Sequence, residues 1–434
     1  MTGSTTVSAD FLGHPKGVYI CFFTEMWERF SFYGMKALLL LYLTKYHLFG
    51  DTGGLNLLGA YGGLVYCIPV IGGMLADRYL GLRKAVVFGG VLLVLGHLGM
   101  AFEGEAARKV GETVVRDTAA LWVFYFSLSL IIMGVGFLKP NISVIVGKLY
   151  PDGDPRRDAG FSLFYAGINL GAMLASLVCG VLGETYGWKY GFGAAGIGMM
   201  AGLAMFIWGQ KYLGGHGEAR APEKLREPVF AGLRREWAIY LGSVIGLAPV
   251  AALMWATGND AFTLNIGLDL TLAQILMLAV LTVVLVWFTR FVLRECTSIE
   301  RQQMIALMLL IFFALVFYTL YEQTYGSWVV FTDRILTKDF FPSMIVEGGL
   351  PLSYFVSATL LMPAAFVLCS EWQDRAPGSK APTTMFLAAS VVTMLLVIGI
   401  IVLQPQTAGS LTFISGVFIL SLAPTLSLLW AWLD

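Results

Sequence analysis

Long apolar segments separated by polar connections recur along the whole of this 434-residue chain. An α-helix needs about 20 predominantly apolar residues to cross the hydrocarbon core of a bilayer. Twelve segments reach that length, near 17–45, 55–76, 84–102, 119–148, 160–184, 190–212, 236–257, 271–293, 303–331, 350–370, 383–404 and 411–433. The pattern therefore predicts an all-α membrane protein with twelve candidate spans.

Composition agrees with a polytopic membrane protein. The chain is 57% hydrophobic and 13% charged, whereas a soluble domain carries about 25% charged residues. The formal net charge is zero, which argues against a nucleic-acid partner. The five cysteines occur singly, without C-x-x-C spacing. We interpret them as reduced packing residues and expect no metal site and no cofactor.

The basic residues predict an orientation. If the N-terminus lies inside the cell, well over half of the 28 Lys and Arg residues fall in cytoplasmic connections, the longest of which is 211–237. Cytoplasmic connections of membrane proteins carry such an excess. The stretch before residue 17 has no basic region ahead of an apolar core, so we expect no cleaved signal peptide.

Four ionisable side chains interrupt the first apolar segment. Glu25, Glu28, Arg29 and Lys36 follow helical spacing and share one face of a helix, with Tyr33 beside them. Each charge near the bilayer centre costs about 2.5 to 3.5 kcal/mol on insertion scales, so the group must pair or face a wet cavity. The structural alternative is a Glu25–Arg29 salt bridge that only stabilises the helix, but it leaves two charges unexplained.

The connection after the second segment reads GGMLADRYLGLRK over 72–84. It resembles the G-x-x-x-D-R-x-G-x-[RK] signature of the major facilitator superfamily, which implies a cytoplasmic latch between two helix bundles. Small residues permit close helix contact, and Asp77 with the basic cluster supplies a breakable ionic contact. The alternative is an ordinary connection rich in basic residues.

Three further polar side chains lie inside later apolar segments. Lys139 precedes Pro140 in the fourth segment, where an ammonium group must find a carboxylate or water. Asn169 offers a donor and an acceptor at mid-depth in the fifth. Glu322 lies among aromatic residues in the ninth, and we expect it to face Lys36 or Arg29. The structural alternatives are a snorkelling Lys139 and a helix-to-helix hydrogen bond through Asn169.

Two motifs resemble those of the proton-dependent oligopeptide transporter family of the major facilitator superfamily. The segment EMWERFSFY over 25–33 resembles E-x-x-E-R-F-x-Y-Y, and FYAGINLG over 164–171 resembles F-Y-x-x-I-N-x-G. The residues KPN over 139–141 and EQ over 322–323 are similar to landmarks on that family's fourth and seventh helices. The resemblance runs from about residue 15 to residue 334. It implies two helix bundles with two extra helices between them.

The resemblance implies three groups of functional residues. Proton coupling is implied for Glu25, Glu28, Arg29 and Lys139. Substrate binding is implied for Arg29 and Lys139 at the peptide carboxylate, Asn169 at the amine, Tyr33 and Tyr66 at the backbone, and Glu322. Gating is implied for Lys36 with Glu322 at the extracellular opening, and for Asp77 and Arg78. Phe32 stands where the family usually has tyrosine, which puts one polar contact to peptide in doubt.

We predict an N-terminal six-helix bundle over 1–213, a linker with two accessory helices over 214–299, and a C-terminal bundle over 300–434. Residues 422–430 resemble the family's eighth helix, and no segment carries the glutamate expected on its tenth. We therefore expect an incomplete C-terminal bundle and interpret 350–404 as an inserted helix pair. Alternatively, these residues are helices eight and nine.

These residues together predict proton-coupled symport of di- and tripeptides into the cell by alternating access. No step needs covalent chemistry, so we expect no enzyme. We expect a monomer in the bacterial inner membrane whose partners are peptide, protons and lipid. Two alternatives remain: the same fold carrying nitrate or a peptide-like drug, and a membrane receptor that binds peptide without moving it.

Overall fold

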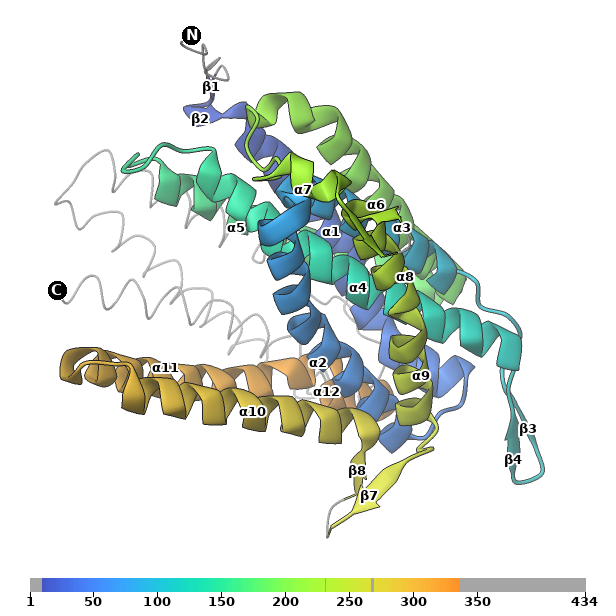
Figure 1. Ribbon diagram of the computed structural model, residues 1–434. Helices are drawn as coiled ribbons and strands as arrows, with labels where there is room; N and C mark the ends of the chain where they lie inside the picture. The colour runs from blue at the N-terminus through green and yellow to red at the C-terminus, as the bar shows by residue number, and fades with distance from the viewer. Residues whose placement is uncertain (1–9, 231, 267–268, 336–434) are drawn as a thin grey trace, which may run out of the picture. The chain divides into compact units, whose positions relative to one another are not determined.

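The structure is a computed structural model that describes residues 10–230, 232–266 and 269–335. Residues Met1–Ser327 form one compact unit and Trp328–Asp434 a second, of which 328–335 are described. Within the described part, long helices are joined by short connections (Figure 1), as the apolar segments predict. The expectations for 350–434 lie outside the described residues.

Eight membrane-length apolar helices occur in the described part. They are α2 (Asp51–Leu75) with a π-helical turn (Ala76–Leu80), α3 (Leu82–Met100), α4 (Thr118–Lys148), α5 (Arg157–Tyr186), α6 (Trp188–Gly209) with a 3₁₀ turn (Gln210–Leu213), α8 (Arg235–Ile245) with α9 (Leu247–Gly258), α10 (Leu272–Arg294), and α11 (Ser298–Glu322) with the start of α12 (Ser327–Ile335). A further helix, α1 (Lys16–Leu41), carries the charged stripe and ends in a π-helical turn (Tyr42–Tyr46).

Two predicted spans are interrupted. The segment 236–257 consists of α8 and α9, which meet at Gly246. Pro249 falls in the first turn of α9, where its missing N–H is tolerated, whereas in the middle of one continuous helix it would remove a hydrogen bond. The segment 303–331 is broken by a 3₁₀ turn at Gln323–Tyr325 and by Gly326. This break follows Glu322 directly.

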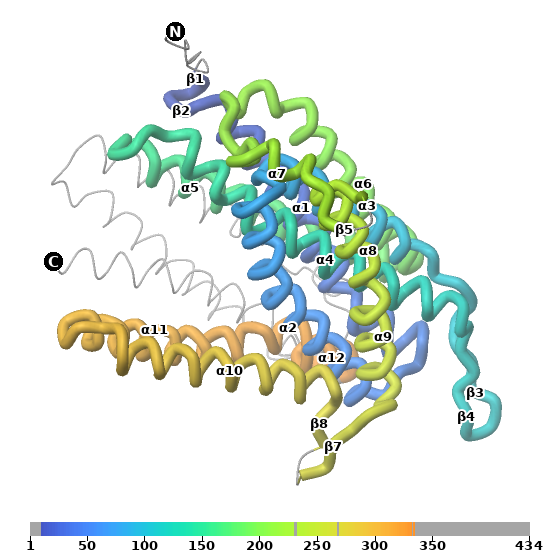
Figure 2. Tube along the Cα trace, viewed as in Figure 1, coloured from blue at the N-terminus to red at the C-terminus, as the bar shows by residue number. Residues whose placement is uncertain are grey.

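The first six long helices pack closely around one another. α1 lies against α5 and α6, α3 against α4 and α6, and α2 against α4. In its most apolar stretch, 78% of α4 is buried, against 6% for α10 and 0% for α11. α10 and α11 run side by side (Figure 2) with their apolar side chains exposed. The core therefore lies on α1 and α4.

Helix α9 packs on the outside of this core. α9 contacts α4 and α2, and Trp255 stacks on Trp122 with ring centres 6.0 Å apart. Leu247 joins Leu92 and Leu130 in one buried cluster. The predicted boundaries at 213 and 299 stay predictions.

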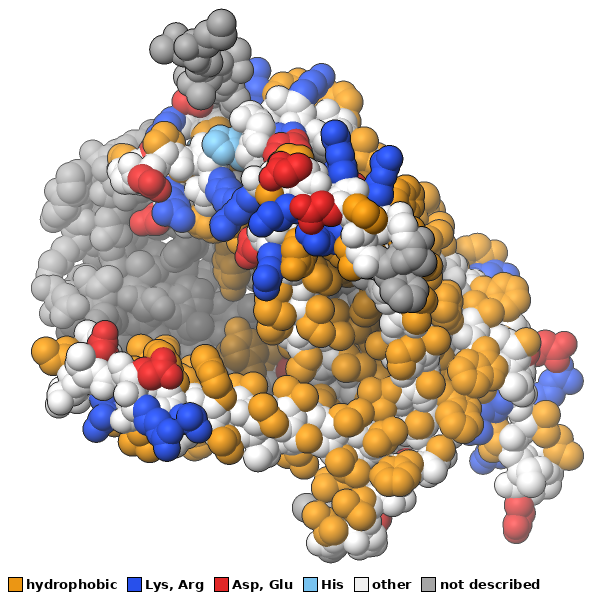
Figure 3. Space-filling view, in the orientation of Figure 1, with side chains coloured by type: hydrophobic (Ala, Val, Ile, Leu, Met, Phe, Trp, Pro, Cys, Tyr) orange, Lys and Arg blue, Asp and Glu red, His pale blue; other side chains and the backbone are white. Residues whose placement is uncertain are grey.

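Charged side chains gather at one end of the helices, over α7 (Pro222–Arg226) and the neighbouring connections (Figure 3). The flank along α8 and α9 is largely hydrophobic in the same view. Charged ends and an apolar flank are what a bilayer requires of a spanning helical protein.

Four short antiparallel hairpins occur among the described residues, one before α1 and three in connections between helices. The apolar pattern does not predict them. They are β1 (Asp10–Phe11) with β2 (His14–Pro15), β3 (Arg108–Val110) with β4 (Thr113–Val115), β5 (Pro228–Phe230) with β6 (Leu233–Arg234), and β7 (Thr263–Asn265) with β8 (Asp269–Thr271). Arg108 pairs with Val115 and Val110 with Thr113. Asp117 then caps α4 by accepting from the Ala120 and Glu105 backbone amides, which hold the pKa of that carboxyl below its usual value.

The cysteine prediction holds only in part. Cys21 and Cys179 are free and buried, as packing residues would be, whereas Cys67 is free but exposed on α2. Calling Cys67 a packing residue is therefore wrong, because its side chain is exposed. Cys369 lies outside the described residues.

Candidate functional site

The charged stripe of α1 faces the protein interior. Glu25, Glu28 and Arg29 are 2%, 0% and 3% exposed. α5 approaches this face so closely that a side chain at Gly171 would collide with the Met26 carbonyl oxygen of α1. Gly171, the last residue of the α5 motif, therefore lets α5 pack directly against α1 and bury the charged side chains.

Arg29 is shared by two carboxylates of its own helix. Its Nε donates to Glu25 Oε1 at 2.8 Å and lies 2.6 Å from Glu28 Oε2. Nε carries one hydrogen, which Glu25 receives, and neither oxygen of Glu28 accepts a hydrogen bond from the described residues. Two acids thus face one base in the protein interior. A proton on Glu28 would remove the excess negative charge.

A second ion pair joins α1 to the end of α11. Lys36 Nζ donates to Glu322 Oε2 at 2.6 Å, across 286 residues of chain. The Lys36 side chain is 4% exposed and that of Glu322 is 39% exposed. The Lys36 ammonium also lies 4.3 Å from the centre of the Tyr325 ring. The structure thus brings Glu322 to Lys36, one of the two partners predicted for it.

Lys139 makes no ion pair with the described residues, unlike Arg29 and Lys36. Its Nζ lies 4.5 Å from the centre of the Tyr66 ring of α2, and the charges of Glu28 and Arg29 act on it. The ammonium group therefore rests on an aromatic face, and no described carboxylate pairs with it. It is available to an anionic ligand.

The Lys139-Pro140 sequence also shapes the backbone. Pro140 has no N–H, so the Gly136 carbonyl loses its helical donor. Gly72, the first glycine of the 72–84 connection, approaches that carbonyl so closely that a side chain there would collide with it. The α2–α4 contact therefore depends on glycine at this point.

Aromatic rings surround the charged groups. Phe32 is 3% exposed, its ring stacks on Tyr61 at 6.3 Å, and it lies 5.5 Å from the Arg29 guanidinium. Tyr33 stacks on Tyr325 with ring centres 6.1 Å apart. The ring that departs from the family pattern thus lies in the interior beside Arg29.

Two of these tyrosines were missed by the sequence interpretation. Tyr325 follows Glu322 by three residues, a helical spacing that could have indicated it. Tyr61 precedes Tyr66 by five residues, which gives no common helical face and hence no signal. Its hydroxyl is buried and has no hydrogen-bond partner among the described residues.

Asn169 lies on an exposed part of α5 and donates from Nδ2 to the Tyr165 carbonyl at 3.0 Å. This bond is within its own helix, so among the described residues the helix-to-helix bond suggested as an alternative is not formed. The role of Asn169 in binding an amine stays a prediction.

Asp77 and Arg78 lie in the π-helical turn after α2, and both are exposed. Neither forms an ion pair with the described residues, so the predicted latch contact is not seen there. The neighbouring cations are engaged by the linker instead, with Arg83 bound to Glu218 at 2.8 Å and Lys84 to Glu236 at 2.6 Å. The latch stays a prediction.

In the part of the chain that the structure describes, no group of three or more His, Cys, Asp and Glu side chains could hold a metal ion. The site consists instead of three cations and three carboxylates among aromatic rings. Ionisable groups enclosed in a helical membrane domain are typical of transport pathways. Fold and site together define a membrane carrier of the major facilitator type.

Comparison with known proteins identifies the group of carriers. The sequence pattern of the POT family (PTR2) matches residues 83–340. An uncharacterized transporter of Bacillus subtilis, YclF, is 34% identical over 382 residues, which span 86% of this chain and 70% of that protein. The chain therefore belongs to the POT family.

Two further proteins give this membership a context. A di-/tripeptide transporter of Lactococcus lactis is 34% identical over 326 residues, and the match covers 72% of this chain and 60% of that protein. The protein in the crystal structure of a mutant peptide transporter POT in complex with alafosfalin has 31% sequence identity to this chain. It superposes with a TM-score of 0.63 over 97% of this chain and 83% of its own.

Proposed function

We propose that this protein imports di- and tripeptides together with protons by alternating access. The observation that carries the proposal is the Lys139 ammonium, which lies on the Tyr66 ring without a carboxylate partner among the described residues. A cation inside the membrane is energetically unfavourable when no protein group pairs with it. A bound ligand can offset this penalty by supplying the anion. The carboxylate of a peptide is such an anion.

The remaining groups suit the rest of a zwitterionic peptide. Arg29 adds a second cation for the peptide carboxylate. The exposed amide of Asn169 and the partly exposed carboxylate of Glu322 suit the peptide amine. Tyr33 and Tyr66 offer hydroxyl groups to the peptide backbone. Contacts to charges and backbone shared by all peptides leave the side chains free to vary.

Proton coupling follows from the excess acid around Arg29. With Glu28 ionised, two carboxylates hold Arg29 within its own helix. A proton on Glu28 or Glu25 would weaken that hold and free the guanidinium for the peptide. Because Lys139 also lies within the field of both acids, the proton and the peptide carboxylate would bind cooperatively.

Gating is assigned to two contacts that can open and close. The Lys36–Glu322 pair would close the extracellular opening when formed. On the cytoplasmic side, Asp77 and Arg78 would form a latch with the other bundle in the outward-open state. The bundles would then rock around the binding residues.

The positive-inside distribution supports a cytoplasmic N-terminus in a bacterial inner membrane. In that orientation the end of the helices at α7 and the α4–α5 connection faces the cytoplasm, and hairpin β3–β4 faces outward. The protein would act as a monomer, as nothing in the proposed cycle uses a second copy.

Uptake in proteoliposomes tests the proposal. With the outside made acidic, labelled dialanine should accumulate against its gradient, and unlabelled dialanine should compete where nitrate does not. Lys139→Ala should abolish this uptake, whereas Lys109→Ala, in the exposed hairpin β3–β4, should leave it unchanged. Competition by nitrate alone would indicate another solute, and peptide binding without counterflow would indicate a receptor.

A further inference from the structure

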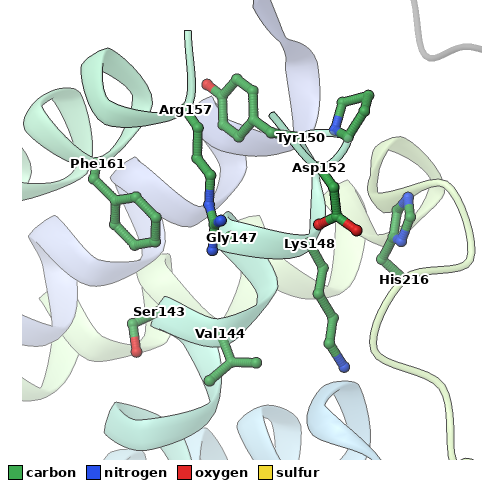
Figure 4. A pocket seen from close by; sticks show the side chains of 10 residues that line it. Ser143, Val144, Gly147, Lys148, Tyr150, Asp152, Arg157, Phe161 and His216 are labelled. Atoms are coloured by element: carbon green, nitrogen blue, oxygen red, sulfur yellow. The ribbon is translucent and has the colours of Figure 1, made fainter. Parts of the chain in front are cut away.

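A cavity of about 660 Å³ lies away from the proposed peptide site, at the end of α4. It is lined by Ser143, Val144, Gly147, Lys148, Tyr150, Pro151, Asp152, Arg157, Phe161 and His216 (Figure 4). These residues come from the last turns of α4, the α4–α5 connection, the first turns of α5 and the linker after α6. The cavity is thus built by two separate stretches of the chain, the continuous run 143–161 and the linker at His216.

Its cations are not neutralised by any carboxylate of the described residues. Neither Lys148 nor Arg157 forms an ion pair with a described carboxylate, and His216 adds an imidazole that makes no hydrogen bond with the described side chains. Arg156, next in sequence, shows the contrast, because Asp154 and Asp10 each hold it at 2.8 Å. Among the described lining residues Asp152 is the one carboxylate, so the cations are in excess there.

The cavity also has an apolar side. Arg157 lies with its guanidinium 5.9 Å from the centre of the Phe161 ring, and both reach the cavity from the same side in Figure 4. A Cβ at Gly147 would come within 3.3 Å of Arg157 Nη2, so glycine leaves room for the guanidinium on α4. Val144, one turn earlier, is 41% exposed. A charged pocket thus adjoins apolar surface at the end of a membrane helix.

We propose that this cavity binds the phosphate group of an anionic phospholipid from the cytoplasmic leaflet. Arg157 and Lys148 would donate to the phosphate oxygens, and Val144 and Phe161 would contact the start of the acyl chains. Basic pockets between membrane helices on the cytoplasmic side suit such headgroups. The proposal rests on the proposed orientation but not on the transported solute.

Native mass spectrometry of the purified full chain with added phosphatidylglycerol or phosphatidylcholine tests the proposal. Phosphatidylglycerol should bind more tightly than phosphatidylcholine. Removing one surface cation weakens headgroup binding by about fivefold, so Lys148→Gln with Arg157→Gln should weaken it roughly 25-fold. Asp152→Asn should tighten binding by about fivefold, because it removes the one acid of the lining.

The matched control removes the same charge on the same side of the membrane but outside the cavity, as Lys211→Gln with Arg220→Gln. It should change phosphatidylglycerol binding little. Equal losses in the two double variants, or none in the cavity variant, would overturn the site. Tight binding of inorganic phosphate that displaces the lipid would identify a free anion as the occupant and overturn the lipid assignment.

The measurement is independent of the proposed function. Lipid binding is read by mass, so it can succeed although no peptide is carried, and peptide counterflow can succeed although the cavity is empty. Counterflow by the cavity variant also shows that this variant is folded.

Discussion

The two ion-pair centres on α1 differ in ways that suit different tasks. The Arg29 centre is buried, lies within one helix and holds two acids for one base. The Lys36 centre holds one acid for one base, joins residues 286 positions apart, and leaves the Glu322 side chain 39% exposed. Only two turns of helix separate Arg29 from Lys36.

The difference lies in what can change at each centre. In the Arg29 centre all three charged groups lie on one rigid helix. Their distances therefore stay fixed, whereas the number of protons that the two acids bind can vary. In the Lys36 centre the charges already balance, so the separation of α1 from the end of α11 can vary instead. The first suits proton binding and the second suits gating.

The largest effect is expected when the Arg29 centre loses its only base. Arg29→Gln leaves two uncompensated carboxylates in the interior, and breaking a buried ion pair from one side costs about 3–5 kcal/mol. The apparent Tm in detergent should fall steeply, and uptake should be lost. Lys36→Met, which leaves the half-exposed Glu322 unpaired, should lower the Tm much less. Equal losses in the two variants would remove the distinction between the centres.

The next effect is functional rather than structural. Glu28→Gln keeps the shape of the side chain and removes the acid whose oxygens accept no hydrogen bond from the described residues. Uptake driven by a pH gradient should be lost, while counterflow of dialanine, which needs no net proton movement, should persist. Unchanged driven uptake in this variant would show that the excess acid is not the coupling group.

A smaller effect on stability is expected from breaking the Lys36–Glu322 ion pair. Because Glu322 is partly exposed, the pair should contribute about 1 kcal/mol or less to stability. Exchanging the two charges, as Lys36→Glu with Glu322→Lys, should restore part of the counterflow that each single variant loses. A double variant no better than the single ones would argue against an electrostatic gate.

The smallest expected effect on stability is an increase, or no change, when a buried polar group is removed. Tyr61 has a buried hydroxyl without a partner among the described residues, so Tyr61→Phe should leave stability unchanged or raise it by about 1 kcal/mol. Tyr125→Phe is the control, because Asn259 donates to that hydroxyl at 3.1 Å and its loss should cost about 1 kcal/mol. Destabilisation by Tyr61→Phe would reveal a polar contact inside the Arg29 centre.

The sequence predicted the parts of the fold and site that depend on local pattern. Apolar length predicted nine spans in the described part, and eight of them are apolar helices of membrane length. Helical spacing placed Glu25, Glu28 and Arg29 on one face. It could not indicate that Pro249 restarts a helix within one apolar segment, since length alone does not distinguish one helix from two. It also could not find Tyr61, because the stack on Phe32 is set by how α2 packs against α1.

Proton movement with peptide tests the central claim most directly. Proteoliposomes that contain a pH-sensitive dye should acidify inside when dialanine is added outside, at equal starting pH and with the membrane potential clamped. The acidification should be absent with Glu28→Gln, although that variant still exchanges dialanine. Dialanine entry without acidification in the parent protein would contradict the account.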